Sequence, residues 1–247
     1  MYSLERPRPT EVHVWQVTAP GPGGLPRGWT DALSAEELER AGRFRSDVDR
    51  LRYMQTRWWL RSVIGAYLGL MPGSLEFSVS PRGKPWLALP ATAWLRFSIS
   101  HSHDLLALAV ANSCEVGVDV ERVPGEPGEI RDAIAVLSSG DREELARCAT
   151  DADRALRFCQ IWTRREAALK ASGAGLGDSP MEGPQGGGPG EPRTSSDRGS
   201  AAPRSEFSLA QIEFGRGFVG AVAANVVGAR LPSYARSLAP ENFLMPS

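Results

Sequence analysis

The sequence has few cysteines, no long apolar run and no export signal, and each shortage excludes a class of protein. Its three cysteines, Cys114, Cys148 and Cys159, lack a Cys-x-x-Cys spacing, which is typical of small buried side chains in a reducing compartment and not of disulfides or a metal cluster. The longest apolar run, residues 105–111, is far shorter than the roughly 20 residues that span a bilayer. Residues 1–9 are charged and lack an apolar core. We therefore expect a cytoplasmic protein with no membrane partner.

Net charge and histidine are also scarce. The 28 Lys and Arg residues nearly balance the 29 Asp and Glu residues, for a formal net charge of −1. No overall field therefore attracts nucleic acid, and any anion site must be local. His101 and His103 form a His-x-His pair, but His13, the remaining histidine, belongs to a different predicted strand. Because a zinc site usually takes three protein ligands, we expect neither a zinc hydrolase nor a nucleic-acid binder.

Hydrophobic periodicity predicts a mixture of helices and strands. Ser34 and Glu37 form a capping-box signature, and an apolar stripe that ends at Gly69 defines a longer helix. Helices are expected after residue 34, over 47–68, near 130 and over 151–172. Strands are expected over 11–17, 75–79, 95–99, 105–111, 116–120, 207–214 and 218–227. The strands over 105–111 and 116–120 are expected to form a hairpin, and the fold class is α+β.

A weak internal repeat points to two halves. Residues 107–112 resemble residues 220–225, and each follows a Trp-bearing helix and an alternating strand. Chance similarity between Ala/Val strands is the alternative. If the repeat is real, the chain has two similar α/β halves, residues 1–115 and 116–247, and a cleft between them is a natural ligand site. Gly, Pro and Ser make up more than half of residues 178–206, so we expect this insertion in the second half to be disordered.

Asp119 and Glu121 are the first candidates for chemistry. In a strand, residues i and i+2 point to the same side, with Cβ atoms about 7 Å apart. Two such carboxylates repel each other unless water or a cation lies between them. Hard oxygen ligands suit Mg²⁺ beside substrate phosphates. The alternative is the solvated polar face of an edge strand.

Basic side chains form the second group of candidates. Glu166 and Lys170 are neighbours at i and i+4 on one helix face, where the alternative is a surface ion pair. Lys84 lies on a rigid Gly83-Lys84-Pro85 turn. The first two helices are rich in arginine, including Arg40 and Arg52, but acidic residues are interleaved with them, which favours a mixed surface over an anion groove.

Together these pieces resemble the phosphopantetheinyl transferase family, in particular its surfactin-synthetase-activating type. Two motifs carry the resemblance: Gly-Val-Asp-Val-Glu at 117–121, and Trp-Thr-Arg-Arg-Glu-Ala-Ala-Leu-Lys at 162–170. The turn at 83–85 and the strand end at 97–102 are also similar, in the expected order. The resemblance runs from about residue 34 to residue 225 and leaves out 178–206.

The resemblance implies two α/β halves related by a pseudo-two-fold axis, with coenzyme A bound between them. It implies transfer of the 4′-phosphopantetheine arm of coenzyme A to a serine of an acyl or peptidyl carrier protein, with Mg²⁺ as cofactor and release of adenosine 3′,5′-bisphosphate. Because the chain has both halves, it resembles the family members that are monomers and serve secondary metabolism, including polyketide and non-ribosomal peptide synthesis.

The resemblance also implies roles for individual residues. Asp119, Glu121 and Glu166 would hold Mg²⁺. The coenzyme A phosphates would be bound by Lys84, Ser100, His101, Arg40, Arg52, Arg165 and Lys170. Glu166 and Lys170 would be catalytic, Glu166 as the base for the carrier serine and Lys170 at the leaving oxygen. Arg165 replaces the usual lysine and can clamp phosphate without exchanging a proton.

Two other functions stay open at this point. One is a different Mg²⁺-dependent phosphoryl or nucleotidyl transferase, which coenzyme A binding would distinguish. The other is a non-enzymatic module that binds the coenzyme or the carrier. The presence of all three acidic positions argues against the second.

Overall fold

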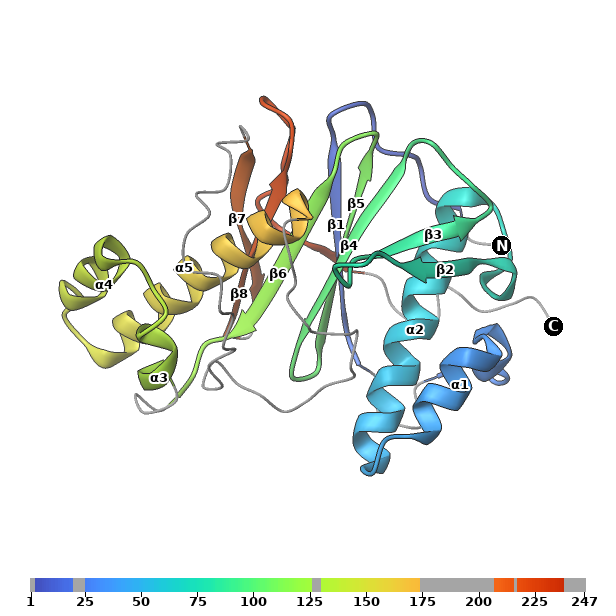
Figure 1. The fold of residues 1–247 in the computed structure, drawn as a ribbon, viewed down its shortest axis with the longest axis horizontal. Coiled ribbons are helices and arrows are strands. Elements are labelled where there is room, and N and C mark those ends of the chain that lie inside the picture. Colours follow the sequence, from blue (N-terminus) through green and yellow to red (C-terminus); the bar gives the residue numbers. More distant parts are fainter. Residues whose placement is uncertain (1–2, 20–24, 126–129, 174–206, 216, 238–247) are drawn as a thin grey trace.

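The computed structural model describes the chain except residues 1–2, 20–24, 126–129, 174–206, 216 and 238–247 (Figure 1). The expected insertion at 178–206 lies outside the described residues. The strands are β1 (Val12–Thr18), β2 (Glu76–Val79), β3 (Pro85–Leu89), β4 (Leu95–Ser102), β5 (Leu105–Asn112), β6 (Val116–Arg122), β7 (Ser208–Gly215), β8 (Phe218–Ala224) and β9 (Arg236–Ser237). The helices are α1 (Ala35–Gly42), α2 (Asp47–Leu68), α3 (Arg131–Ile134), α4 (Ser139–Ala146) and α5 (Asp151–Ser172), with 3-10 turns at Trp29–Ala32 and Pro72–Ser74.

The strands form two main antiparallel sheets, and the α+β class is confirmed. One sheet has the order β4-β5-β1, with the short β9 parallel to β1 at its edge, and the other has the order β6-β8-β7. In each set of three long strands, the one that comes last in the chain lies in the middle. β2 and β3 form a separate hairpin. The halves of the chain thus have the same strand order.

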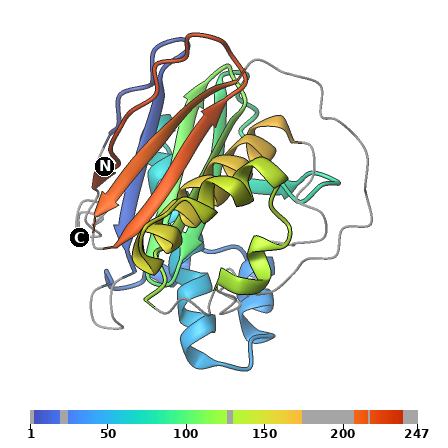
Figure 2. The same cartoon turned by 90° about the vertical axis from the view of Figure 1, so that its left-hand side faces the viewer.

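The two main sheets pack face to face around a shared apolar core (Figures 1 and 2). β5 is buried along its whole length and alternates between two cores. Leu106, Leu108 and Val110 face α2, and Leu105, Ala107, Ala109 and Ala111 face the second sheet. On the far side of the second sheet, α5 packs Ala167 and Ala171 on Ala221 and Ala223 of β8. The two long helices therefore cover the outer faces, and the sheets meet in the middle.

The long helices begin and end where the sequence predicts. Ser34 and Glu37 form the expected reciprocal capping box. α2 spans the expected residues and ends at Gly69, whose φ of 66° is left-handed, and α5 ends in the same way at Gly173. α4 was not expected, because its eight residues bury only Leu145 and so carry little periodic signal. Among the described residues, no helix combines the length and apolar character needed to cross a bilayer.

The expected hairpin between residues 105–111 and 116–120 is wrong. β5 pairs with β1 and β4, whereas β6 pairs with β8 in the other sheet. Ser113, with φ of 62°, lies in the short link that carries the chain from one sheet to the other. Because both strands are buried, distant segments compete for their edges, and local alternation cannot identify the partner. The local hairpin is β4–β5, which turns at His103 with φ of 55°.

Candidate active site

β4 and β6 lie side by side where the two sheets meet, with β6 paired to β8 along its other edge. We call this line, residues 98–102 and 118–122, the β4–β6 seam. Side-chain hydroxyls bridge it: Ser98 Oγ accepts from the Val118 N–H at 3.1 Å, and Ser102 Oγ accepts from the Arg122 N–H at 3.1 Å. Because serines stand at every second position of β4, they all face β6. Backbone donors at the edge of β6 are therefore satisfied by serine side chains.

Asp119 lies at the centre of the seam and is buried. Its Oδ1 accepts hydrogen bonds from Ser100 Oγ at 2.8 Å and from Lys170 Nζ at 2.7 Å. Lys170 Nζ also donates to Ser100 Oγ at 3.1 Å and to the Val118 carbonyl at 3.2 Å. In contrast, Asp119 Oδ2 is buried and has no hydrogen-bond partner among the described residues. A buried polar atom without a partner costs free energy of folding unless a bound ligand or ion interacts with it.

Glu121 continues the same strand. Ser102 Oγ donates to its Oε2 at 3.0 Å. Burial raises the pKa of Glu121 to about 8, and the charges of Asp119 and Glu166 add to the rise, against the lowering effects of the Ser102 hydrogen bond and Lys170. Two neighbouring carboxylates that resist joint ionisation favour a cation between them.

Close packing between α5 and β6 brings the second motif to this strand. A Cβ atom at Gly117 would lie 2.6 Å from the Ala171 backbone nitrogen and would overlap the Ala167 carbonyl oxygen. Glycine at 117 therefore lets the helix rest directly on the strand. This contact places Lys170 on Asp119 and brings Glu166 close enough to Glu121 to affect its pKa.

The chemistry of these donors fits Mg²⁺. The described residues hold no cluster of three or more His, Cys, Asp or Glu side chains at metal-binding distance. Mg²⁺ commonly takes only one or two carboxylates and completes its shell with water and substrate phosphates. Asp119 Oδ2, which no described residue contacts by a hydrogen bond, and Glu121 two residues further on supply donors of that kind.

His101 lies at the edge of this group with an exposed face. Burial of the remainder of the ring lowers the pKa of His101, and the positive charges of Lys170 and Arg52 lower it further, against the opposing charge of Asp119. Two predicted phosphate ligands, His101 and Arg52, thus share one electrostatic environment with Lys170 and Asp119.

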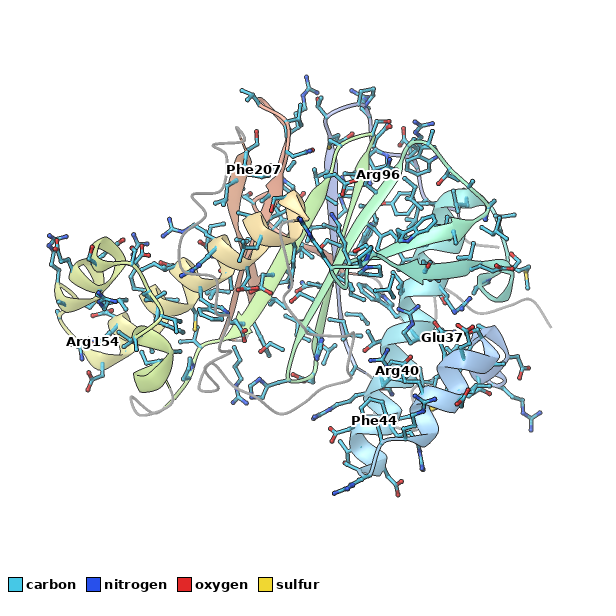
Figure 3. All side chains as sticks on the ribbon, viewed as in Figure 1. Glu37, Arg40, Phe44, Arg96, Arg154 and Phe207 are labelled. Carbon is cyan, nitrogen blue, oxygen red and sulfur yellow. The ribbon has the colours of Figure 1, made fainter. Side chains whose placement is uncertain are left out.

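Lys84 lies further along the same edge of β6. Its Nζ donates to the Val116 carbonyl at 3.2 Å and forms an ion pair with Glu115 at 2.6 Å. Arg96, labelled in Figure 3, contacts the other oxygen of Glu115 at 2.8 Å. Lys84 and Lys170 therefore donate to carbonyls two residues apart on one strand, and Glu115 holds Lys84 in place.

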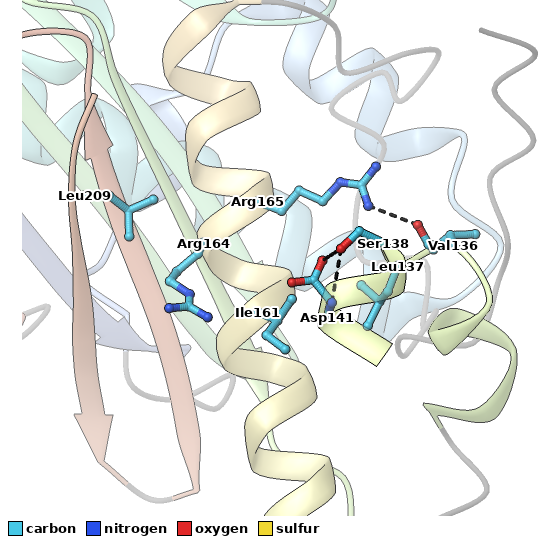
Figure 4. Close-up of a pocket in the computed structure, with 8 residues that line it drawn as sticks. All are labelled: Val136, Leu137, Ser138, Asp141, Ile161, Arg164, Arg165 and Leu209. Carbon is cyan, nitrogen blue, oxygen red and sulfur yellow. Dashed lines mark hydrogen bonds between the residues drawn. The ribbon is translucent and has the colours of Figure 1, made fainter. Parts of the chain in front are cut away.

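The structure does not bring Arg40 and Arg165 to the carboxylates. Arg40, on α1 and labelled in Figure 3, lies over the Tyr53 ring at 5.7 Å from its centroid. Arg165 Nη1 donates to the Val136 carbonyl at 3.0 Å and lines a pocket of about 640 Å³ between α5, α4 and β7 (Figure 4). Among the described residues, neither arginine forms a hydrogen bond with Asp119 or Glu121.

Sequence reasoning assigned no role to Ser98, Ser102 or Glu115. The signal for the serines was present as their alternation along β4, but the strand they face could not be identified from local pattern. Glu115 precedes β6 and carries no motif of its own, so no signal identified it.

Two carboxylates, of which Asp119 is buried, and two flanking lysines at the junction of the sheets suit an enzyme that transfers phosphate-linked groups with a divalent cation. Comparison with known proteins specifies that class. Residues 115–213 match the family described as 4′-phosphopantetheinyl transferase superfamily, and residues 27–113 match the family described as 4′-phosphopantetheinyl transferase, N-terminal.

Individual relatives agree. The chain is 36% identical over 168 residues to the 4′-phosphopantetheinyl transferase HetI of Nostoc sp. strain PCC 7120, over 67% of this chain and 70% of that protein. It is 31% identical over 145 residues to a 4′-phosphopantetheinyl transferase of Bacillus subtilis, over 59% of this chain and 62% of that protein. It is 33% identical over 117 residues to the 4′-phosphopantetheinyl transferase AcpT of Escherichia coli K12, over 47% of this chain and 57% of that protein.

The chain belongs to the 4′-phosphopantetheinyl transferase superfamily. The function expected from the sequence, transfer of 4′-phosphopantetheine from coenzyme A to a carrier-protein serine, is thereby confirmed.

Proposed function

We propose that this chain performs the transfer at the β4–β6 seam, with Mg²⁺ held by Asp119, Glu121 and Glu166. The observation that carries the proposal is the buried Asp119 Oδ2, which has no hydrogen-bond partner in the described part of the chain, next to a second carboxylate with a raised pKa. When bound, Mg²⁺ neutralises charge on the pyrophosphate of coenzyme A.

The protein's own residues then promote the transfer of phosphopantetheine to the carrier serine. The carrier serine Oγ forms a bond to the β-phosphorus of coenzyme A, and the bond from that phosphorus to the bridging oxygen breaks. Adenosine 3′,5′-bisphosphate leaves. Glu166 accepts the serine proton, directly or through water. Lys170, held at the site by Asp119 and Ser100, stabilises the charge that develops on the leaving oxygen.

The remaining cations bind the coenzyme. Ser100 and His101 belong to the seam, Lys84 contacts the neighbouring Val116 carbonyl, and Arg52 on α2 forms an ion pair with Asp49 at 4.0 Å. All four are proposed to contact the phosphates of coenzyme A, with Lys84 exchanging its contact with Glu115 for one with a phosphate. Arg40 and Arg165 stay predictions as phosphate ligands, because their contacts in this structure lie elsewhere.

We further propose the surfactin-synthetase-activating type, acting as a cytoplasmic monomer, with two halves related by a pseudo-two-fold axis and coenzyme A bound between them. The equal strand orders of the two sheets and the successive matches at 27–113 and 115–213 support this. By analogy with that type, the carriers belong to secondary metabolism, including polyketide and non-ribosomal peptide synthesis.

The test is the intact mass of an apo carrier protein after incubation with coenzyme A, Mg²⁺ and this protein. We expect a gain of one phosphopantetheine. Asp119→Asn should slow the gain by more than the roughly 100-fold that loss of an outer-shell partner costs. The control is Glu213→Gln, an exposed carboxylate on β7 of the same sheet, which should react like the wild type. No gain with acyl, peptidyl and aryl carriers, despite coenzyme A binding, would show a non-enzymatic module instead.

A further inference from the structure

Ser102 is the last residue of β4, and its buried hydroxyl occupies a fully connected position. Its Oγ accepts from the Arg122 N–H at 3.1 Å and lies 3.0 Å from Glu121 Oε2 and 3.3 Å from His103 Nδ1. A serine hydroxyl has one proton and two acceptor lone pairs. Three neighbours therefore use its whole hydrogen-bonding capacity.

The chemistry of the neighbours sets the direction of each bond. The Arg122 N–H can only donate, and Glu121, ionised when it binds the cation of the proposed function, can only accept. The single proton of Ser102 is then directed to Glu121, and the His103 Nδ1–H donates to Ser102 Oγ. His103, with φ of 55°, is held in a left-handed turn that places its ring next to this hydroxyl.

The other two serines of the seam show what is particular to Ser102. Ser98 Oγ accepts from the Val118 N–H and bonds to no carboxylate in the described residues. Ser100 bonds to Asp119, and Ser102 bonds to Glu121. Each carboxylate of β6 thus receives a hydroxyl from β4, and the two pairs keep the same two-residue spacing.

We propose that Ser102 is a positioning residue for Glu121, with His103 as the outer member of the relay His103–Ser102–Glu121. Ser102 does not touch the coenzyme or the cation. It restricts the Glu121 side chain to one rotamer, so the carboxylate binds the cation without first losing conformational freedom. This inference rests on the proposed function, because it assumes that Glu121 is a metal ligand.

The test measures the affinity for Mn²⁺. The full chain is titrated with Mn²⁺ in the presence of coenzyme A, and the free ion is quantified by its electron paramagnetic resonance signal. Ser102→Ala should weaken Mn²⁺ binding by on the order of 10-fold. Ser102→Thr keeps the hydroxyl and should stay within about threefold of the wild type, which is small beside that loss. Ser98→Ala is the matched control: it removes a buried hydroxyl from the same face of β4 and should leave the affinity unchanged, whatever it does to the melting temperature.

The outcomes separate the two proposals. If the wild type binds Mn²⁺ and Ser102→Ala binds it equally well, the positioning role is overturned and the metal site stands. Equal weakening by Ser98→Ala and Ser102→Ala would also overturn it, because the effect would then be general loosening of the seam. No Mn²⁺ binding by the wild type would overturn the metal site and this inference together. If Ser102→Ala does not fold, Ser102→Cys keeps the size, replaces the hydroxyl by a weak donor, and should weaken binding in the same direction.

Discussion

Glu37 is the buried charge on which the first two helices depend. Its Oε1 lies 2.5 Å from Arg57 Nε and its Oε2 lies 2.7 Å from Arg61 Nε, while Arg61 also donates to the Leu75 carbonyl at 2.7 Å. Figure 3 labels Glu37 on α1. All three side chains are almost fully excluded from water. The capping carboxylate of α1 thereby ties α1 to α2 and to the segment before β2.

Glu37→Gln should lower the free energy of unfolding by about 3 to 5 kcal/mol, because it leaves two arginines buried without their anion. The measurement is urea unfolding at pH 7. The control is Glu39→Gln, which breaks the exposed Glu39–Arg43 pair on the same helix and should cost less than about 1 kcal/mol. Equal effects would contradict the assigned role of burial.

The contribution of Glu37 to the stability of the fold should be lost at acid pH. Burial by itself raises the pKa of Glu37, but the charges and hydrogen bonds of Arg57 and Arg61, with the Ser34 N–H, hold it below its usual value. A depressed pKa contributes stability that is complete above the unfolded value of roughly 4.3 and is lost as pH falls through the folded value. Melting temperatures between pH 7 and 3 should therefore fall less steeply for Glu37→Gln than for the wild type, and parallel curves would contradict this.

At the scale of elements, the contact between α5 and β6 determines the geometry of the site. Gly117 allows it, since any side chain there would meet the backbone of α5. The motif at 117–121 in β6 and the motif at 162–170 in α5 are consequently one structural unit, although about 40 residues separate them.

Gly117→Ala should lower the free energy of unfolding by about 1 to 3 kcal/mol, as overpacking does. It should also lower transfer activity under conditions where the protein stays folded, because Lys170 moves away from Asp119. The control is Gly140→Ala in α4, where an added Cβ meets nothing within 4 Å and stability should rise slightly or stay unchanged. Full activity of folded Gly117→Ala would show that the close contact is not needed.

The elements also show how far the sequence predicts the structure. The boundaries of α2 and α5 follow from caps and glycines that act within a few residues, and both helices were predicted. The pairing of β6 with β8 joins residues about 100 positions apart, so no local pattern reveals it. For the same reason, the sequence places Asp119 and Glu121 on one strand and the serines at the end of another, but it does not predict that these serines contact the two carboxylates.

At the scale of the whole molecule, one of the apolar cores is shared by the two halves. Val12 and Val14 of β1 and the inner face of β5 pack with β6, β7 and β8. The described parts of each half therefore cover an apolar face of the other, although α2 also has a core within the first half.

We expect the chain to unfold in a single cooperative transition. Tryptophan fluorescence reports mainly on the first half, which holds six of the seven tryptophans, including the buried Trp58 and Trp59, while far-ultraviolet circular dichroism reports on both halves. The two signals should change at the same denaturant concentration. Separate midpoints would show that the halves are independent domains.

The central claim is that transfer depends on a divalent cation held by the carboxylates of the seam, and metal removal tests it most directly. The initial rate of carrier modification would be measured after EDTA treatment and during titration with Mg²⁺, for the wild type and for Asp119→Asn. We predict no transfer in EDTA, full recovery of the wild type with Mg²⁺, and no comparable recovery of Asp119→Asn. Undiminished transfer in EDTA, or equal recovery of both proteins, would contradict the account.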